Sequence, residues 1–326
     1  LEWLCDFLQN RTQVVRAGGQ ESDVVALKYG VPQGSVLGPK RFIEYAEDVT
    51  RLLETHELQY HLFADDMQAL QHGPPADVPR IVSALDNCFA DISDWCASKR
   101  LQLNATKTEV LWFGSAANLR KIPPGSGSVH AGSSVIEPLS VVRDLGVMID
   151  AQLSMQEHVS RTARSCFFHL RRLRSVRIRS SVVHVTANLV AALVLSRLDY
   201  CNAVLAELPA STLAPLQRVL HAAARLVCGL RPRDHVTASL KELHWLPIRQ
   251  RIDYKLCLMV HNVSVGHAPA YLSDILKPVA AVPSRAHLRD AAEGDFVVPG
   301  SRLKLGDRAF SIAAPRAWNR LPTELK

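Results

Sequence analysis

Two adjacent aspartates, Asp65 and Asp66, are the residues of this sequence best suited to chemistry. They follow the strand-like residues 58–64, and residues 67–70 return to a strand pattern, so the pair is predicted to lie at the tip of a β-hairpin. Like charges this close repel unless a cation lies between them. Carboxylate oxygens are the ligands that Mg²⁺ prefers, and a hairpin tip presents them to solvent and substrate phosphate. The pair therefore indicates a divalent-metal site, with an ordinary polar turn as the alternative.

A loop rich in glycine and proline precedes the aspartate pair. Residues 30–39 (GVPQGSVLGP) hold three glycines and two prolines, a density that neither a helix nor a central strand tolerates. Ser35 is expected to cap the turn that follows. Beyond the loop, apolar residues spaced by three and four predict a helix over residues 41–56.

The rest of the first 150 residues mixes helix and strand patterns. One apolar helix face runs over residues 81–96, residues 101–103 and 110–113 are strand-like, residues 118–134 are predicted to form an exposed loop, and a hairpin ends at about residue 149. These elements are expected to surround one antiparallel sheet. Residues 150–265 are almost entirely helical in pattern, and the proline-punctuated tail beyond residue 266 is predicted to be irregular.

Charge divides the chain into two electrostatically different halves. Residues 1–150 hold 13 Lys and Arg against 19 Asp and Glu, a net charge of −6, whereas residues 151–326 hold 25 against 12, a net charge of +13. Between residues 161 and 179, seven arginines occur with no acidic residue among them: Arg161, Arg164, Arg171, Arg172, Arg174, Arg177 and Arg179. This density suits a phosphate backbone, and a solvated helix face is the alternative.

Length and composition set the class of protein. A chain of 326 residues with 48% hydrophobic and 21% charged residues predicts two or three folded domains and excludes disorder as the main state. Seven cysteines are spread singly with no CxxC pair, so neither a disulfide framework nor a zinc site has the expected spacing. The apolar residues 182–195 include three polar residues and are too short for a membrane span, which predicts a buried helix.

Taken together, these motifs resemble a known family. The loop 30–39 followed by Phe63-Ala64-Asp65-Asp66 is similar to two successive motifs of reverse transcriptases from non-LTR (LINE-type) retrotransposons. Residues 101–104 (LQLN) with 107–109 (KTE) resemble the next palm motif, and residues 144–147 (DLGV) resemble the primer-grip hairpin after it. The tail segments 243–247 (LHWLP), 306–310 (GDRAF) and 314–319 (APRAWN) resemble the C-terminal region of the jockey-like branch. The resemblance therefore covers nearly the whole chain, as the C-terminal part of such a protein.

The resemblance implies roles for individual residues. Asp65 and Asp66 would be palm metal ligands in a two-metal transfer, in which a DNA primer 3′-hydroxyl attacks the α-phosphate of a dNTP on an RNA template, with Mg²⁺ as the metal. The matching nucleotide and template pocket residues are Gln33, Gly34, Phe63, Ala64 and Lys107. The alternatives are a turn glycine at position 34, a core phenylalanine at position 63 and a solvated lysine at position 107.

The family motif that supplies a third palm aspartate has no match in this sequence. Only 29 residues precede Gly30, and their acidic residues lack the apolar strand expected around that aspartate. The fingers are also expected to be missing, which suggests a cut through a longer protein. We therefore expect the chain to be inactive alone, because a metal would be underligated where charge develops.

The fold expected is α+β: a partial polymerase palm over residues 1–150, with an antiparallel sheet and packed helices, then an all-helical thumb-like region over 151–230 and a C-terminal extension over 231–326. The function implied is that of a reverse transcriptase fragment. The alternatives are a non-catalytic remnant that holds RNA or DNA through its arginines, and a decayed chain with no function. The family implies a nuclear location and no membrane partner, and the oligomeric state stays open.

Overall fold

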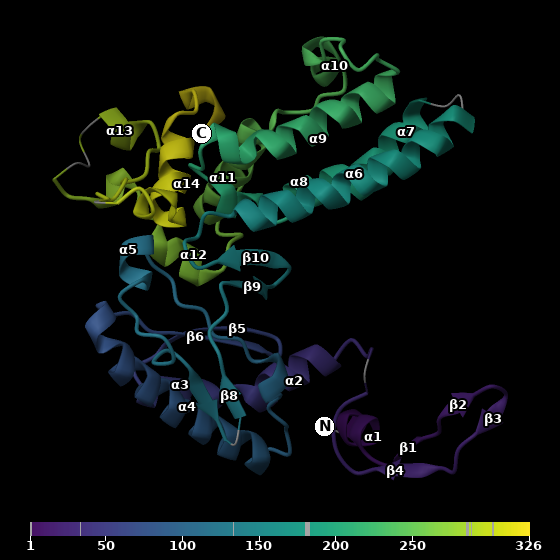
Figure 1. Ribbon diagram of the computed structural model, residues 1–326, viewed down its shortest axis with the longest axis vertical. Helices are drawn as coiled ribbons and strands as arrows, with labels where there is room; N and C mark the ends of the chain where they lie inside the picture. Colours follow the sequence, from purple (N-terminus) through teal and green to yellow (C-terminus); the bar gives the residue numbers. More distant parts are fainter. Residues whose placement is uncertain are drawn as a thin grey trace. The chain divides into compact units, whose positions relative to one another are not determined.

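The computed structural model describes residues 2–32, 34–132, 134–179, 183–284, 287, 289–301 and 303–326. The chain divides into two compact units. The first comprises Leu1–Val110 and Ala117–Pro138, and the second comprises Leu111–Ala116 and Leu139–Lys326 (Figure 1). The fold is mixed α and β, with small antiparallel sheets followed by a helical region, which confirms the predicted class.

The first unit begins with an arm that has no core of its own. Helix α1 (Glu2–Leu8) leads into β1 (Arg11–Gln13), which pairs antiparallel with β4 (Val25–Leu27), and β2 (Arg16–Ala17) pairs with β3 (Gln20–Glu21). No described residue before Gly38 is buried, and apolar side chains such as Trp3 and Val24 are more than 60% exposed.

The helical stretch predicted over residues 41–56 is two helices, α2 (Gly38–Ala46) and α3 (Val49–Thr55). Asp48 occupies the break, where its carboxylate accepts a hydrogen bond from the Trp95 indole at 3.2 Å and pairs with the Lys99 ammonium at 2.7 Å. Both partners come from the region of α4 (Val78–Ser98), about 50 residues later. The single-helix prediction is therefore wrong at this point, because a distant contact fixes the interruption.

The core of the first unit joins a hairpin to two helices. Strands β5 (Gln59–Phe63) and β6 (Asp66–Leu70) pair antiparallel, as predicted. The core comprises Leu53, Leu58, Cys88, Ile92 and Cys96, and Tyr60, Leu62 and Met67 of the hairpin pack against it. Because side chains alternate along a strand, the opposite face of the hairpin faces away from this core.

The strands form separate pairs and not one sheet. The described strands make five two-stranded antiparallel sheets, which corrects the expected single sheet. Residues 101–103 and 110–113 are not strands either: Leu101 and Leu103 pack on the core without a strand partner, and the 110–113 stretch makes only an isolated bridge from Val110 to Pro138. Leu101 and Leu103 bury their side chains on the core, but no described strand lies beside either stretch to form a hydrogen-bonded ladder with it.

The first unit ends with a region predicted as an exposed loop. After η1 (Pro75–Asp77), α4 and η2 (Ala105–Lys107), a short helix α5 (Ala116–Leu119) precedes the hairpin β7 (Val129–Ala131) and β8 (Ser134–Ile136). Val129 and Ala131 are buried, and the His130 backbone N–H donates to the Asp86 carboxylate of α4 at 2.6 Å. The loop prediction is therefore wrong for residues 128–131.

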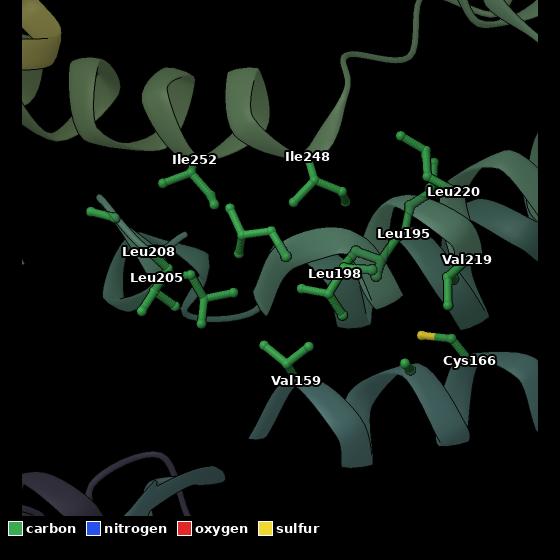
Figure 2. Close-up of a cluster of buried hydrophobic side chains, with 14 of the residues drawn as sticks. Val159, Cys166, Leu195, Leu198, Leu205, Leu208, Val219, Leu220, Ile248 and Ile252 are labelled. Atoms are coloured by element: carbon green, nitrogen blue, oxygen red, sulfur yellow. The ribbon is translucent and has the colours of Figure 1, made fainter. Parts of the chain in front are cut away.

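The second unit is built around a long helix. Hairpin β9 (Val141–Asp144) and β10 (Val147–Asp150) leads into α6 (Gln156–Arg179), and the chain returns through α7 (Val183–Val190), the π-helical turn η3 (Ala191–Leu195) and α8 (Ser196–Asp199). After η4 (Asn202–Leu205), α9 (Ala210–Cys228) packs along α6. The buried cluster joins Val159 and Cys166 of α6 to side chains of α8, α9 and α11 (Ile248–Ser264) (Figure 2).

Helices α10 (Thr237–Glu242) and α11 lie in the stretch predicted to be helical. The tail beyond residue 266 is more ordered than predicted, since it contains α12 (Ala270–Ile275), η5 (Val279–Ala281), α13 (Arg289–Ala292), η6 (Gly306–Arg308), α14 (Phe310–Asn319) and η7 (Thr323–Leu325). Helix α14 packs on α11, and Trp318 is 3% exposed with its indole N–H donating to the Gly294 carbonyl at 3.0 Å. In the part of the chain that is described, no helix is both long and apolar enough to cross a bilayer.

Candidate functional site

The aspartate pair lies at the tip of the β5–β6 hairpin, as predicted. Phe63 pairs with Asp66, so Ala64 and Asp65 form a two-residue turn. Ala64 has φ 55°, a left-handed conformation that costs a residue with a Cβ on the order of 1 kcal/mol. The strained turn is held by its base, where the Tyr60 hydroxyl donates to the Glu54 carboxylate at 2.8 Å and Leu62 packs on the core.

Both carboxylates of the tip are open to a ligand. Asp65 and Asp66 are exposed, and neither has a hydrogen bond or an ion pair with any described residue. Their oxygens are hard donors that suit a divalent cation completed by water and phosphate oxygens. No group of three or more His, Cys, Asp or Glu side chains that could hold a metal occurs among the described residues. The donor set fits Mg²⁺ in kind, as one side of a shared site and not as a protein cage.

Phe63 is the residue beside the tip whose position is informative. Its side chain is 59% exposed, so the alternative of a core phenylalanine is wrong. An exposed ring next to two exposed carboxylates combines an apolar surface with a cation-binding group. This combination suits a nucleotide, which presents a base and a triphosphate.

The loop that starts at Gly30 is held at both ends. The Arg11 guanidinium donates to the Gly30 carbonyl at 2.5 Å, and the Ser35 hydroxyl donates to the Pro32 carbonyl at 2.7 Å while accepting from the Gly38 N–H at 3.1 Å. The predicted capping role of Ser35 is therefore confirmed. Gly34 has φ +78° and open space around its missing Cβ, so the backbone conformation alone requires glycine there. Gln33 lies outside the described residues.

Lys107 ends the 3₁₀ turn η2 with an exposed side chain. The turn is fixed by Asn104, whose side-chain oxygen accepts from the Thr106 N–H at 3.1 Å and from the Thr106 hydroxyl at 2.6 Å. Among the described residues, the Lys107 ammonium has no ion pair with a carboxylate and no hydrogen bond to the hairpin tip. Its position is compatible with either the solvated lysine or the triphosphate role.

A tyrosine from the helical region contacts the turn of the β9–β10 hairpin. In the β9–β10 turn, Leu145 and Gly146 have φ 41° and 85°. The Tyr200 hydroxyl donates to the Leu145 carbonyl at 2.5 Å, and a Cβ on Gly146 would lie 3.2 Å from the Tyr200 ring. Tyr200 thus covers the turn that resembles a primer grip, while its side chain stays 52% exposed.

The predicted arginine run is carried by α6. Four of its arginines lie within a 100° arc of the helix, a surface that we name the arginine face: Arg161, Arg164, Arg171 and Arg172. All four are exposed, as is Arg174, which lies outside this arc, and none pairs with an acidic side chain in the described structure. Arg177 and Arg179 belong to the last turn of α6, where only the backbone is described. The arginine face lacks internal neutralisation and suits a polyanion.

The surroundings of the arginine face add a titratable group. Burial lowers the pKa of His169, and the nearby Arg197 and Arg172 lower it further. The Arg172 guanidinium lies 5.6 Å from the Phe168 ring centroid. An aromatic ring among cations is the arrangement used to hold nucleic acid strands.

The sequence pattern did not reveal two features of the second unit. Nothing in the sequence at residues 145 and 200 signals their contact across 55 positions. The surface between α6 and α9 depends on how those helices pack. The absence of acidic residues from α9 was the one available signal for it.

Comparisons with known proteins agree with the motifs. Residues 2–149 match the family model described as "Reverse transcriptase (RNA-dependent DNA polymerase)". The chain is 23% identical over 189 residues to a probable RNA-directed DNA polymerase from transposon BS of Drosophila melanogaster, covering 56% of this chain and 20% of that protein. It is 28% identical to RNA-directed DNA polymerases from the mobile element jockey of Drosophila melanogaster and Drosophila funebris, over 47% of this chain and 16% of each. No solved structure matches it.

The chain therefore spans a fifth or less of the length of these relatives. The matched family segment ends at the β9–β10 hairpin, at the point where α6 is about to begin. Both aspartates, the glycine loop and Lys107 lie within the matched segment, whereas the arginine face lies beyond it.

Proposed function

Because residues 2–149 belong to the reverse transcriptase family, in its non-LTR retrotransposon branch, we propose that this chain is a polymerase fragment that holds divalent metal and nucleic acid but does not synthesise DNA alone. The observation that carries the proposal is the exposed, unpartnered carboxylate pair on a strained hairpin tip. The family generally uses divalent metal ions, and Mg²⁺ is the metal proposed here. The proposed substrates are dNTPs, with an RNA template and a DNA primer.

The residues of the tip have separable tasks in this proposal. Asp65 and Asp66 would hold the metal, which when bound neutralises their repulsion and the charge of substrate phosphates. Phe63 offers its exposed ring to the nucleotide, Ala64 keeps the turn tight, and the loop around Gly34 contributes backbone that a side chain does not obstruct. Lys107 supplies a cation for a triphosphate, or a proton for the leaving pyrophosphate.

Inactivity follows from the size of the donor set. Two-metal catalysis stabilises both the attacking and the leaving oxygen. The described residues offer two adjacent carboxylates and no third acidic, histidine or cysteine side chain beside them. A metal ion held only by these two carboxylates would be loosely positioned. Stabilising the charge that develops in the transition state requires a metal ion in a fixed position, so we expect little catalysis.

Metal binding can be tested apart from activity. Mn²⁺, as a paramagnetic stand-in for Mg²⁺, is titrated into the full chain and its free signal is followed by electron paramagnetic resonance. We expect wild type to bind Mn²⁺ and the double variant Asp65→Asn, Asp66→Asn to lose that binding, whereas Asp94→Asn, at an exposed aspartate of α4, retains it. Equal binding by wild type and the double variant would contradict the proposed site.

Activity is tested by primer extension on poly(rA)/oligo(dT) with Mg²⁺. The proposal predicts no incorporation by the chain alone. Incorporation that the Asp65→Asn, Asp66→Asn variant abolishes would show that a third ligand exists within the chain and that the predicted inactivity is wrong.

A second function is favoured by the arginine face. A chain that only grips RNA or DNA should lose affinity steeply with ionic strength and should be indifferent to Asp65→Asn. The exposed arginines of α6, without acidic partners, support this non-catalytic role. Template-directed incorporation dependent on Asp65 would exclude it as the whole function.

A further inference from the structure

A groove between α6 and α9 in the second unit is not used by the features above. Its volume is about 580 Å³, within the range of small-molecule sites. Side chains from both helices line it, among them Ser160 and Phe167 of α6 and Ser211, Thr212, Pro215 and Arg218 of α9. The two helices pack side by side (Figure 1).

The residues that line the groove form a polar part and an apolar part. Hydroxyls come from Ser160, Ser211 and Thr212, and an apolar wall comes from Phe167 and Pro215. The α7–α8 return between the two helices makes α6 and α9 run in the same direction, so the three hydroxyls lie toward the start of both helices. Phe167 and Arg218 then lie about 10 Å further along, at seven residues of 1.5 Å each.

The first turn of α9 adds donors at the hydroxyl end. Thr212 and Leu213 donate their backbone N–H groups to the Pro209 carbonyl, and Pro209 at the N-cap has no side-chain acceptor for the remaining first-turn N–H groups. The helix is 19 residues long, so its amino end carries a partial positive charge.

The two helices that form the groove carry mostly positive charge. Helix α6 contains seven arginines and α9 contains two, and Glu157 is the one acidic residue in the two helices. Arg218 is exposed and has no acidic partner among the described residues. The nearby Glu207 is already engaged by Arg249 at 3.6 Å and Arg320 at 3.9 Å. The groove therefore favours an anion.

We propose that the α6–α9 groove binds one nucleotide unit of a single-stranded nucleic acid, with a phosphate at the hydroxyl end and a base against Phe167. The inference rests on the proposed nucleic-acid function and deepens it, because the arginine face lies on the same helix as the groove. A single strand is required because its bases are free to stack on an aromatic ring, whereas a duplex presents mainly its backbone. Arg218 meets an adjoining phosphate or the face of the base.

The test compares a single strand with a duplex. Binding of the full chain to a fluorescein-labelled 12-nucleotide oligo(rU), and to a duplex of equal length, is measured by fluorescence anisotropy. Phe167→Ala is expected to weaken single-strand binding by about tenfold, within the range that base–aromatic stacking supplies, and duplex binding by less than about twofold. Arg218→Gln is expected to reduce the single-strand salt slope by about 0.7.

Matched controls lie on the same unit away from the groove. Tyr254→Ala removes a ring that is 59% exposed on α11, and Arg233→Gln removes an exposed arginine. Both are expected to bind like wild type. Unfolding midpoints of all variants are compared, so that a loss of fold at Phe167 is recognised. Photo-crosslinking of oligo(5-iodouridine) to wild type gives a readout that needs no variant, and the crosslink is expected on the peptide that contains Phe167.

The outcomes separate the groove from the arginine face. If glutamine at the four positions of the arginine face leaves binding unchanged, the proposed nucleic-acid function fails. If that variant loses binding while Phe167→Ala and Arg218→Gln equal wild type and no crosslink maps to α6 or α9, the groove proposal alone is overturned. Equal weakening of single strand and duplex by Phe167→Ala would refute the base pocket. Displacement of the crosslink by free UMP, with oligonucleotide affinity unaffected by Phe167→Ala, would reassign the groove to free nucleotides and overturn it as well.

Discussion

Replacing the four residues of the arginine face with glutamine is expected to flatten the salt dependence of RNA binding. The four positions extend from residue 161 to residue 172, which is about 16 Å along the helix axis. One strand of a duplex presents about five phosphates over that length, at one per 3.4 Å. The four guanidinium groups are therefore numerous enough, and close enough together, to contact four successive or nearly successive phosphates.

The size of the effect follows from counterion release. Each phosphate contact on a single strand contributes about 0.7 to the slope of log K against log salt, so removing four lowers the slope by about 2.8. Between 50 and 200 mM salt, the logarithm of concentration changes by about 0.6, so wild type should lose about 50-fold more affinity than the variant over this range. None of the four arginines has an acidic partner, so the substitutions remove no ion pair and stability should change by less than about 0.5 kcal/mol each.

The assay is fluorescence anisotropy of a labelled single-stranded RNA at four salt concentrations, with thermal unfolding as the check on folding. A control with Arg231→Gln and Arg233→Gln changes the net charge by two without touching α6. It separates the general effect of charge from the effect of the face. A variant slope equal to that of wild type, with intact fold, would refute the reasoning that this face contacts phosphates.

Three further outcomes are expected. Tyr200→Phe removes the hydrogen bond to the Leu145 carbonyl and keeps the ring, so amide hydrogen exchange at residues 145–146 should become faster with a loss of at most about 1 kcal/mol; unchanged exchange would contradict this contact. Burial lowers the pKa of His158, so the unfolded chain takes up a proton first, and stability that is complete above pH about 6.5 is lost as the pH falls toward the lower folded value; urea unfolding at pH 7.5 and 5.5 should show a smaller difference for His158→Gln. Leu220→Ala, at a fully buried position of α9, should reduce the free energy of unfolding by about 2–5 kcal/mol, measured as a lower urea midpoint.

The elements that the sequence predicted correctly are those whose signal is local. Alternation of exposed and half-buried residues from Gln59 to Phe63 defines β5, and the apolar spacing from Ile81 to Cys96 defines α4. Each of these two patterns can be recognised from the residues of one element, because that element buries a single face against the core of the first unit. The hairpin tip at Asp65 and Asp66 followed from the two strand patterns, and the observed turn, Ala64 and Asp65, lies one residue earlier than predicted.

The elements that were predicted wrongly depend on distant partners. Residues 101–103 have a strand-like composition, but a strand needs a neighbouring backbone, and Leu101 and Leu103 instead pack their side chains on the core. The break between α2 and α3 is fixed by Trp95 and Lys99. The proline-punctuated tail was predicted to be irregular, yet Pro315 is fully buried inside α14, which packs on α11.

The candidate functional residues also fall into two groups, those that a local sequence motif identifies and those that only the packing of distant elements brings together. Motif residues such as Gly34 and Asp66 are recognisable because their chemistry is concentrated in consecutive positions. Tyr200 and the groove at Phe167 and Arg218 are not, since they exist only through the packing of helices that lie tens of residues apart in sequence. Division of the chain at residues 150 and 230 stays a prediction, although the β9–β10 hairpin clusters with the helical unit.

The two exposed charge features make opposite demands on a ligand, and a nucleic acid with divalent cations meets both. Residues 1–150 carry −6 and repel a polyanion, whereas residues 151–326 carry +13 and attract one. Binding free energy must therefore come mainly from the second region, and a cation at Asp65 and Asp66 must offset the repulsion at the tip before a phosphate can approach. The proposed function therefore separates affinity from metal binding: it assigns strand affinity to the arginine face and the metal to the carboxylate pair, so substitutions at one should leave the other unchanged.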